Sequence, residues 1–415
     1  MRSLQLSGGA MANRTDEQAP TPTAAAIAAV ARMLRRPLAS YHLVLGSAGL
    51  LLALGLVMVF SASSFTSQHA YGDPYRVFVR QVILAAVGLA IAWLASRSKV
   101  GTVRRLAFPL LVTAIVLLFL TYVPGLGVTV NGTRAWLDLG GELFRLQPSE
   151  LAKLGLILWG AHVLARKGPL LRQWKHIAVP FLPVAAAVVA LTVGQNDLGT
   201  SLILMSIVLA ILWVLGVPTW LFGLALGTVA LVATYFITAA DHRRSRVSIF
   251  LDPWQDPEAA GYQSIHAIYA FADGGWWGRG LGASSEKLGR LPEAHTDFIF
   301  AIIGEELGLP GTFVVLGLFG VLSYAGVRIA WRARDPFVRL AAAGITGWLV
   351  VQALVNLGSV LGVLPVVGVP LPLVSYGGSA LVPTLVAVGL LVCFAKEEPG
   401  ARAALQARRR SRKET

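Results

Sequence analysis

Residues 41–62 read YHLVLGSAGLLLALGLVMVFSA and contain no Lys, Arg, Asp or Glu. A helix needs ~20 mainly apolar residues to cross the hydrocarbon core of a bilayer, and this stretch is long enough to do so. It is also too long for the apolar core of a signal peptide, and no convincing cleavage site follows it. The stretch therefore predicts a retained membrane-spanning helix.

The composition extends this prediction to the whole chain. Of the 415 residues, 55% are apolar and only 13% are charged, and the mean hydropathy is +0.67. A soluble domain carries about 25% charged residues, so an aqueous fold could not bury this much apolar surface. The single cysteine, Cys393, excludes a disulfide within the chain and argues against a thiol or metal centre.

Ten apolar runs of suitable length predict an all-α polytopic membrane protein with about ten transmembrane helices. Basic residues gather at the ends of these runs. A chain that starts in the cytoplasm places the Lys- and Arg-containing loops 96–105, 166–175 and 332–337 inside, and both termini are then cytoplasmic. The ten runs are 41–62, 77–95, 106–123, 149–165, 176–194, 198–215, 219–239, 310–331, 338–360 and 379–395.

The chain divides into three predicted parts. Residues 1–40 predict a disordered cytoplasmic tail, residues 41–396 form the transmembrane domain, and residues 397–415 form a basic cytoplasmic tail. The net charge of +14 accompanies no soluble nucleic-acid-binding module, so we expect no nucleic-acid partner. The predicted outer loops are 63–76, 124–148, 195–197, 240–309 and 361–378.

The large extracytoplasmic loop 240–309, between predicted helices 7 and 8, is long enough to be functional or disordered, and its aromatic content favours a folded structure. Near its middle, apolar residues repeat at helical spacing and a Trp pair follows. Two interpretations stay open: an amphipathic helix in the headgroup plane with Trp anchors, or an ordinary packed helix. The repeat is Ile265, Ile268, Tyr269 and Ala272, and the pair is Trp276–Trp277.

The predicted spanning runs carry almost no charge at mid-depth, which moves the expected chemistry to the outer surface. At the start of run 149–165, Pro148 and Ser149 suit a helix N-terminus. Glu150 and Lys153 are three residues apart and share one face of that helix. They form either a functional pair or a local ion pair that closes the helix end.

Two further outer segments carry candidate groups. Arg243 and Arg246 open the long loop, and guanidinium groups bind phosphate oxygens, although contact with lipid headgroups explains them equally well. Thr296 is predicted to cap a short helix and to place Asp297 in its first turn. The helix dipole would favour the ionised carboxylate, and apolar surroundings would raise its pKa. From spacing alone, a cap-region carboxylate without a catalytic role is the more common case.

At these segments the sequence resembles the family of FtsW, RodA and SpoVE, the polytopic proteins of bacterial division, elongation and sporulation. The residues Ser285-Glu286-Lys287 and the long N-terminal tail are most similar to the division branch, whereas Gly289-Arg290 and Trp276–Trp277 depart from the pattern. The resemblance covers residues from about 41 to 396. The matching stretches are 131–136, 147–153, 252–254, 291–308 and 370–379.

The resemblance implies a multi-pass peptidoglycan glycosyltransferase of the bacterial cytoplasmic membrane, acting at the division septum. Lipid II and an undecaprenyl-diphosphate-linked glycan are the implied substrates. A class B penicillin-binding transpeptidase and other division proteins are the implied partners. By family pattern Asp297 is the catalytic carboxylate, with Glu150 and Lys153 as functional neighbours. We assign Arg243, Arg246 and His295 to substrate binding as well.

Inverting transfer needs one base for the acceptor hydroxyl and one positive site for the leaving diphosphate, so the pair of carboxylates of a glycosidase is not required. No organic cofactor is expected. No metal-ligand spacing appears, and a divalent cation requirement stays open. Three alternatives remain: a RodA-like elongation polymerase, a scaffold, and a lipid II flippase. A flippase predicts a polar groove, for which Gln352 and Asn356 are almost the only polar residues at depth.

Overall fold

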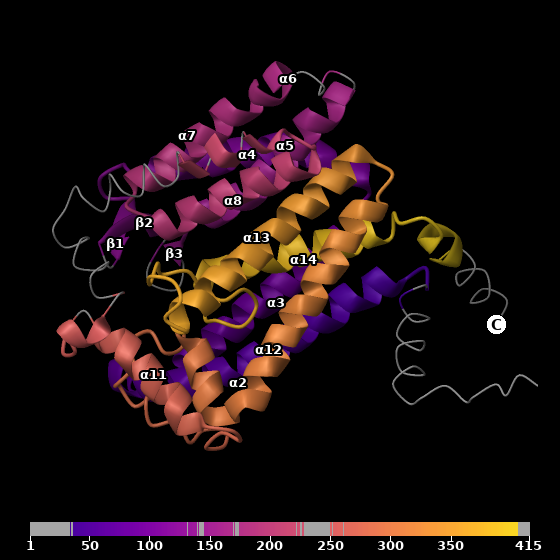
Figure 1. The fold of residues 1–415 in the computed structure, drawn as a ribbon. Helices are drawn as coiled ribbons and strands as arrows, with labels where there is room; N and C mark the ends of the chain where they lie inside the picture. The colour runs from indigo at the N-terminus through magenta and orange to yellow at the C-terminus, as the bar shows by residue number, and fades with distance from the viewer. Residues whose placement is uncertain are drawn as a thin grey trace, which may run out of the picture.

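The structure is a computed structural model that describes residues 34–405 except 35, 131, 139, 141–144, 169, 171–173, 221, 225, 228–249, 251 and 260. Arg243 and Arg246, most of the predicted helix 219–239 and most of both predicted tails therefore lie outside the described residues. The described chain is a bundle of helices that run roughly along one another (Figure 1).

Within the described residues, six helical segments have the length and apolarity of a membrane span. Each predicted run other than 219–239 coincides with one or two helices, so the helical character of these runs is confirmed. The six segments are α2 (Ala39–Tyr71), α3 (Arg76–Arg97), α4 (Val100–Leu120), α12 (Ile299–Arg332), α13 (Pro336–Val360) and Gly378–Ala395, which comprises η4 (Gly378–Ala380) and α14 (Leu381–Ala395). The other helices are α5 (Pro148–Lys167), α6 (Trp174–Ala178), α7 (Phe181–Gly194), α8 (Leu198–Val214), η3 (Pro253–Gln255) and α11 (Tyr262–Gly274).

Helix α5 lies at the centre of the bundle, between α4 and α13, and most of its side chains are buried. Small residues allow such close packing. A Cβ on Gly155 would come within 3.0 Å of the Leu111 backbone on α4, and a Cβ on Gly389 would come within 2.4 Å of the Ala92 carbonyl on α3. By contrast, α3 and α4 expose large apolar side chains along their outer faces. Such faces belong against lipid, because water would not tolerate patches of this size.

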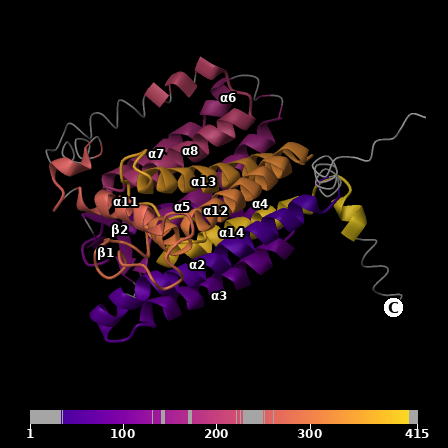
Figure 2. The same cartoon turned by 60° about the horizontal axis from the view of Figure 1, so that its bottom comes forward.

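The two ends of the bundle carry different groups. Both views place α11 and the strands at one end, and residues 396–405 at the other (Figures 1 and 2). At the second end Arg104 bonds Asp335 with 2.7 and 2.9 Å contacts, and Lys396 donates to the Ser96 carbonyl at 2.6 Å. Two of the three loops predicted to be cytoplasmic, 96–105 and 332–337, thus meet at one end. Their assignment to the cytoplasm continues to rest on the positive charge of these loops.

A small antiparallel sheet at the other end was not predicted. It comprises β1 (Gly127–Val130), β2 (Thr133–Asp138) and β3 (Arg145–Leu146) in the order β1-β2-β3. These strands are too short to show a clear alternation in the sequence, so they were read as the outer loop 124–148. The amide of Arg134 donates to the Gln195 carbonyl at 3.0 Å and joins the sheet to the α7–α8 turn.

In the long loop, α11 (Tyr262–Gly274) is a helix with one packed and one exposed face, and its position in the headgroup plane stays a prediction. The face of α11 that carries small side chains packs on α12, where a Cβ on Gly274 would come within 2.0 Å of the Gly304 carbonyl. Its other face exposes Ile268 and Tyr269, and both Trp276 and Trp277 are exposed. The loop ends earlier than predicted, because α12 begins at Ile299 and kinks at Gly308, which has a φ of 63°. Because of this kink, the apolar run in the sequence predicts a helix that starts only at residue 310.

Candidate active site

The start of α5 is held by two distant segments. Gln147 precedes the helix in an extended conformation, and Pro148 occupies the first helical turn, where its missing N–H costs nothing. The Gln147 backbone N–H donates to Ser379 Oγ at 3.0 Å, and its side-chain Nε2 donates to Asp197 Oδ2 at 3.1 Å. These contacts hold the start of α5, with Glu150 in its first turn, against Asp197 and η4.

Glu150 and Lys153 form an ion pair with a 2.8 Å contact, as their spacing predicted, and both side chains are almost fully buried. The pair does more than close a helix end. Lys153 Nζ also donates to Gln352 Oε1 on α13 at 3.0 Å, and it lies 5.0 Å from the centre of the Trp348 ring. Oε2 of Glu150 has no hydrogen-bond partner among the described residues, so one carboxylate oxygen is available as an acceptor.

Asp297 lies in a turn immediately before α12. The prediction that Thr296 caps the helix is wrong: the helix starts at Ile299 after Phe298, and Thr296 Oγ1 donates instead to the Glu293 carbonyl at 3.1 Å and to its carboxylate. The Asp297 carbonyl accepts a 2.7 Å hydrogen bond from Asn356 Nδ2. Asp297 is thus in the turn ahead of the helix and is held from α13.

The surroundings of the Asp297 carboxyl favour its protonated form. Burial, followed by the negative charges of Glu293 and Asp197, raises its pKa to about 7. Desolvation therefore outweighs any help from the dipole of α12, whose first turn starts beyond this residue. A carboxyl group with a pKa near the working pH is well suited to general-base catalysis, because it is substantially ionised and still basic.

His295 connects this turn to the loop 361–378. Its carbonyl accepts from the Tyr376 N–H at 2.9 Å, and the two rings lie 5.5 Å apart between their centres. Burial lowers the pKa of the His295 imidazole, against a smaller opposing effect of Glu293. The ring is therefore neutral at pH 7 and contributes a hydrogen-bonding surface, not a positive charge.

Three residues at the site were underestimated from the sequence. The Asp197 carboxylate caps α8 by accepting a 3.0 Å bond from the Thr200 N–H, and it also accepts from Gln147 Nε2 and raises the pKa of Asp297 through its negative charge. Gln352 and Asn356 were noted only as polar residues at depth. Their spacing of four residues was the available signal, since it puts both amides on one face of a helix.

A second polar cluster lies beside the site and has a structural function. Lys287 Nζ contacts Glu306 Oε1 at 2.7 Å and Ser61 Oγ at 2.8 Å. Glu305 accepts from the Ser285 N–H at 2.7 Å and from the Ser284 hydroxyl. All four carboxylate oxygens of Glu305 and Glu306 are bonded, so the cluster joins the long loop to α2 and α12.

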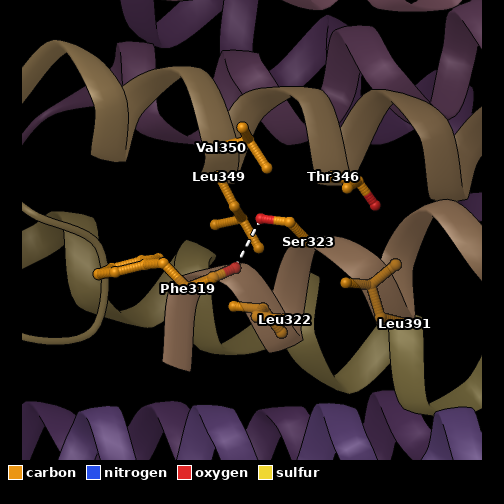
Figure 3. A pocket seen from close by; sticks show the side chains of 7 residues that line it. All are labelled: Phe319, Leu322, Ser323, Thr346, Leu349, Val350 and Leu391. Carbon is orange, nitrogen blue, oxygen red and sulfur yellow. Dashed lines mark hydrogen bonds between the residues drawn. The ribbon is translucent and has the colours of Figure 1, made fainter. Parts of the chain in front are cut away.

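Among the described residues, the crevice between α12, α13 and α14 lacks charged groups like those of this site. This small crevice is lined almost entirely by apolar side chains, including Phe319 and Leu391 (Figure 3). Its hydroxyl groups are satisfied within their own helices: Ser323 bonds the Phe319 carbonyl at 2.6 Å and Thr346 bonds the Ala342 carbonyl at 2.7 Å. Among the described residues no three His, Cys, Asp or Glu converge as metal ligands, so we derive no step through a metal ion.

Asp297, His295, Glu150 and Lys153 thus gather at one end of the bundle, around the loop 361–378. This arrangement can be compared with known proteins. The profile of a family described as cell cycle proteins, which groups FtsW, RodA and SpoVE, matches residues 41–399. The chain belongs to this family.

Relatives and solved structures agree with that assignment. A probable peptidoglycan glycosyltransferase FtsW of Mycobacterium tuberculosis is 43% identical, over 91% of this chain and 71% of that protein. A relative of the same name from Geobacter metallireducens is 40% identical over 82% and 91% of the two chains. Both relatives have a higher sequence identity to this chain than the two solved structures described next.

Two solved structures of the family share the fold. One, titled for the coordination of polymerization and crosslinking by a peptidoglycan synthase complex, is 32% identical with a TM-score of 0.69, covering 85% of this chain and 97% of that one. The rod shape determining protein RodA of Thermus thermophilus is 30% identical with a TM-score of 0.63, covering 86% and 96%. The prediction of a polytopic helical membrane fold is confirmed by this likeness.

Proposed function

We propose that this protein is a peptidoglycan glycosyltransferase that polymerises lipid II at the outer face of the cytoplasmic membrane, at the division septum. The observation that carries the proposal is the carboxyl of Asp297, whose pKa is raised to about 7 at the end of the bundle that also holds Lys153 and Glu150. The names of the relatives support the reaction class and the division role.

In the proposed reaction Asp297 removes the proton of the acceptor hydroxyl as its oxygen attacks the anomeric carbon of the donor. A glycosidic C–O bond forms, the bond to the diphosphate oxygen breaks, and the configuration at that carbon inverts. Undecaprenyl diphosphate leaves with the bonding electron pair. A preorganised positive site stabilises the charge that develops on it.

We assign that positive site to Arg243, Arg246 and Lys153. An ammonium group has three N–H donors, and Lys153 uses two of them on Glu150 and Gln352. One donor remains for a substrate oxygen. Glu150 cancels most of the ammonium's charge, so Lys153 contributes orientation more than electrostatic attraction, and the arginines supply the charge.

The proposed partner is a class B penicillin-binding transpeptidase that cross-links the new strands. The similar structure of a peptidoglycan synthase complex supports such a pairing. A flippase gains no support from the described residues. Gln352 and Asn356, the polar groups that would line its groove, direct their amide N–H groups to carbonyls of the loop 361–378.

The proposal is tested with purified full-length protein and its cognate transpeptidase in detergent micelles, supplied with fluorescently labelled lipid II. A polymerase lengthens glycan strands in micelles, which gel electrophoresis resolves as a ladder. A flippase or a scaffold leaves lipid II at its original size. Absence of any strand longer than the substrate would overturn the proposal, provided that binding of the transpeptidase is retained.

A further inference from the structure

Three polar side chains on one face of α13 hold the loop 361–378. They follow the spacing i, i+4, i+7, which is one face of a helix. Gln352 Nε2 donates to the Pro370 carbonyl at 2.9 Å and Asn356 Nδ2 to the Val369 carbonyl at 2.8 Å. The Ser359 hydroxyl shares its one hydrogen between the Pro365 carbonyl at 2.9 Å and the Val355 carbonyl of its own helix at 2.8 Å. All three side chains are buried.

Two of these side chains also contact the site. Asn356 Nδ2 uses its second hydrogen on the Asp297 carbonyl at 2.7 Å. Gln352 Oε1 accepts from Lys153 Nζ at 3.0 Å and from Trp348 Nε1 at 2.7 Å. Gln352 and Asn356 are four positions apart on α13, which corresponds to a rise of about 6 Å along the helix axis. The Asn356 amide therefore joins the Val369 carbonyl to Asp297. The Gln352 amide joins the adjacent Pro370 carbonyl to the Lys153 ammonium.

We infer that Asn356 is a positioning residue for Asp297, since a single side-chain amide fixes both the backbone of the acid and the loop that forms the wall beside it. The inference rests on the proposed function of Asp297. The wall is close: a Cβ on Gly368, which has a φ of 70°, would lie 3.6 Å from Asp297 Oδ2. Ser359 supplies a matched control, because it holds the same loop without touching Asp297.

Without the amide, the Asp297 turn and the loop can move apart, and the partly exposed carboxyl becomes more accessible to water. A misplacement of about 1 Å in a reacting group can cost about 100-fold in rate. We therefore expect Asn356→Leu, which keeps the number of side-chain heavy atoms and removes both N–H donors, to lower kcat about 10- to 100-fold. The half-saturating lipid II concentration should change little, because Asn356 contacts no substrate in the proposed reaction.

The pH profile separates positioning from general damage. The charged groups that act on Asp297 are Glu293 of its own turn and Asp197 at the start of α8, with His295 beside it, and the substitution leaves all three in place. Hydration lowers the pKa of Asp297, so the acid side of the kcat profile should move to lower pH in Asn356→Leu. It should stay in place in Ser359→Ala, whose kcat should remain within a few-fold of the parent.

The experiment measures lipid II polymerisation from pH 5 to 9 for the parent, Asn356→Leu, Ser359→Ala and Asp297→Asn, each with the cognate transpeptidase. If Asn356→Leu does not fold, Asn356→Ser, which retains one donor for two carbonyls, replaces it. An unshifted profile with parental kcat overturns the inference. An equal loss in Ser359→Ala also overturns it, because the loop alone would then matter. If Asp297→Asn is fully active, the proposed function itself is wrong.

Discussion

The ammonium nitrogen of Lys153 lies 2.8 Å from Oε1 of Glu150, and both side chains are buried between α5 and α13. A pair of this kind is stable only as a pair, because removing one member leaves an uncompensated charge in an apolar interior. Gln352 Oε1 accepts from both Lys153 Nζ and Trp348 Nε1, which fixes the geometry of the pair. The Glu150–Lys153 ion pair therefore contributes to the stability of the bundle and lies in the proposed active site.

Breaking this pair should destabilise the protein. We expect Lys153→Met to lower the free energy of unfolding by about 3–5 kcal/mol, because Glu150 is left buried and unpaired. The double variant Lys153→Met with Glu150→Leu should recover most of that loss without recovering polymerisation. Thermal unfolding in detergent, followed by tryptophan fluorescence, measures the first effect. Equal stability of the single variant and the parent would show that water or lipid compensates Glu150.

Asp297→Asn should abolish polymerisation while leaving the fold intact. Removal of a general base typically costs about 100- to 10,000-fold in rate, roughly 3 to 5 kcal/mol of barrier. Binding of lipid II and of the transpeptidase should persist, because the amide keeps the size of the carboxyl. Glu293→Gln is the matched control, since it changes an acid in the same turn and should retain polymerisation within a few-fold. Activity of Asp297→Asn close to the parent would move the role to Glu150.

The rate of polymerisation should rise with pH through about pH 7, because Asp297 acts as a base only when ionised and its pKa is raised to about 7. Glu293 contributes to that shift through its negative charge. Glu293→Gln should therefore lower the pKa of Asp297 and move the acid side of the profile to lower pH. A profile with the same midpoint in both proteins would contradict the electrostatic coupling.

The same group makes stability depend on pH. A carboxyl whose pKa is higher in the folded than in the unfolded state binds more protons when folded, so stability falls as pH rises from about 4 to 7. The Asp297→Asn variant lacks this penalty. We expect its unfolding temperature, relative to the parent, to be higher at pH 8 than at pH 5. A difference between the two proteins that does not vary with pH would argue that the carboxyl is well hydrated.

Orientation in the membrane can be tested with single cysteines in a Cys393→Ser background. Glu258→Cys lies in an exposed part of the long loop and should react with an impermeant thiol reagent added outside spheroplasts. Ala403→Cys is exposed at the opposite end and should react only after lysis. Ser284 is unsuitable as a reporter because it is buried. Labelling of Ala403→Cys alone in intact spheroplasts would place the proposed site on the cytoplasmic side.

The sequence by itself determined the helical membrane fold and the positions of most helices. A bilayer requires ~20 apolar residues in each crossing. This requirement is visible within a single stretch of sequence, such as residues 41–62. The Glu150–Lys153 pair was also predictable, because residues three apart on a helix must share a face. The kink at Gly308 was not predictable, since it depends on close contact with Trp276, Trp277 and Gly278. Thr296 does not cap α12 because its hydroxyl donates to Glu293 in the same turn.

Only the tertiary structure decided how the site is held. Asn356 meets Asp297 across 59 residues of chain, and Lys153 meets Gln352 across 199. No local periodicity records such contacts. The pKa of Asp297 likewise depends on burial and on Asp197, which belongs to a different helix start. Residue type and spacing can identify a candidate catalytic acid from the sequence. Its pKa and its orientation depend on groups that only the packing of the helices brings close to it.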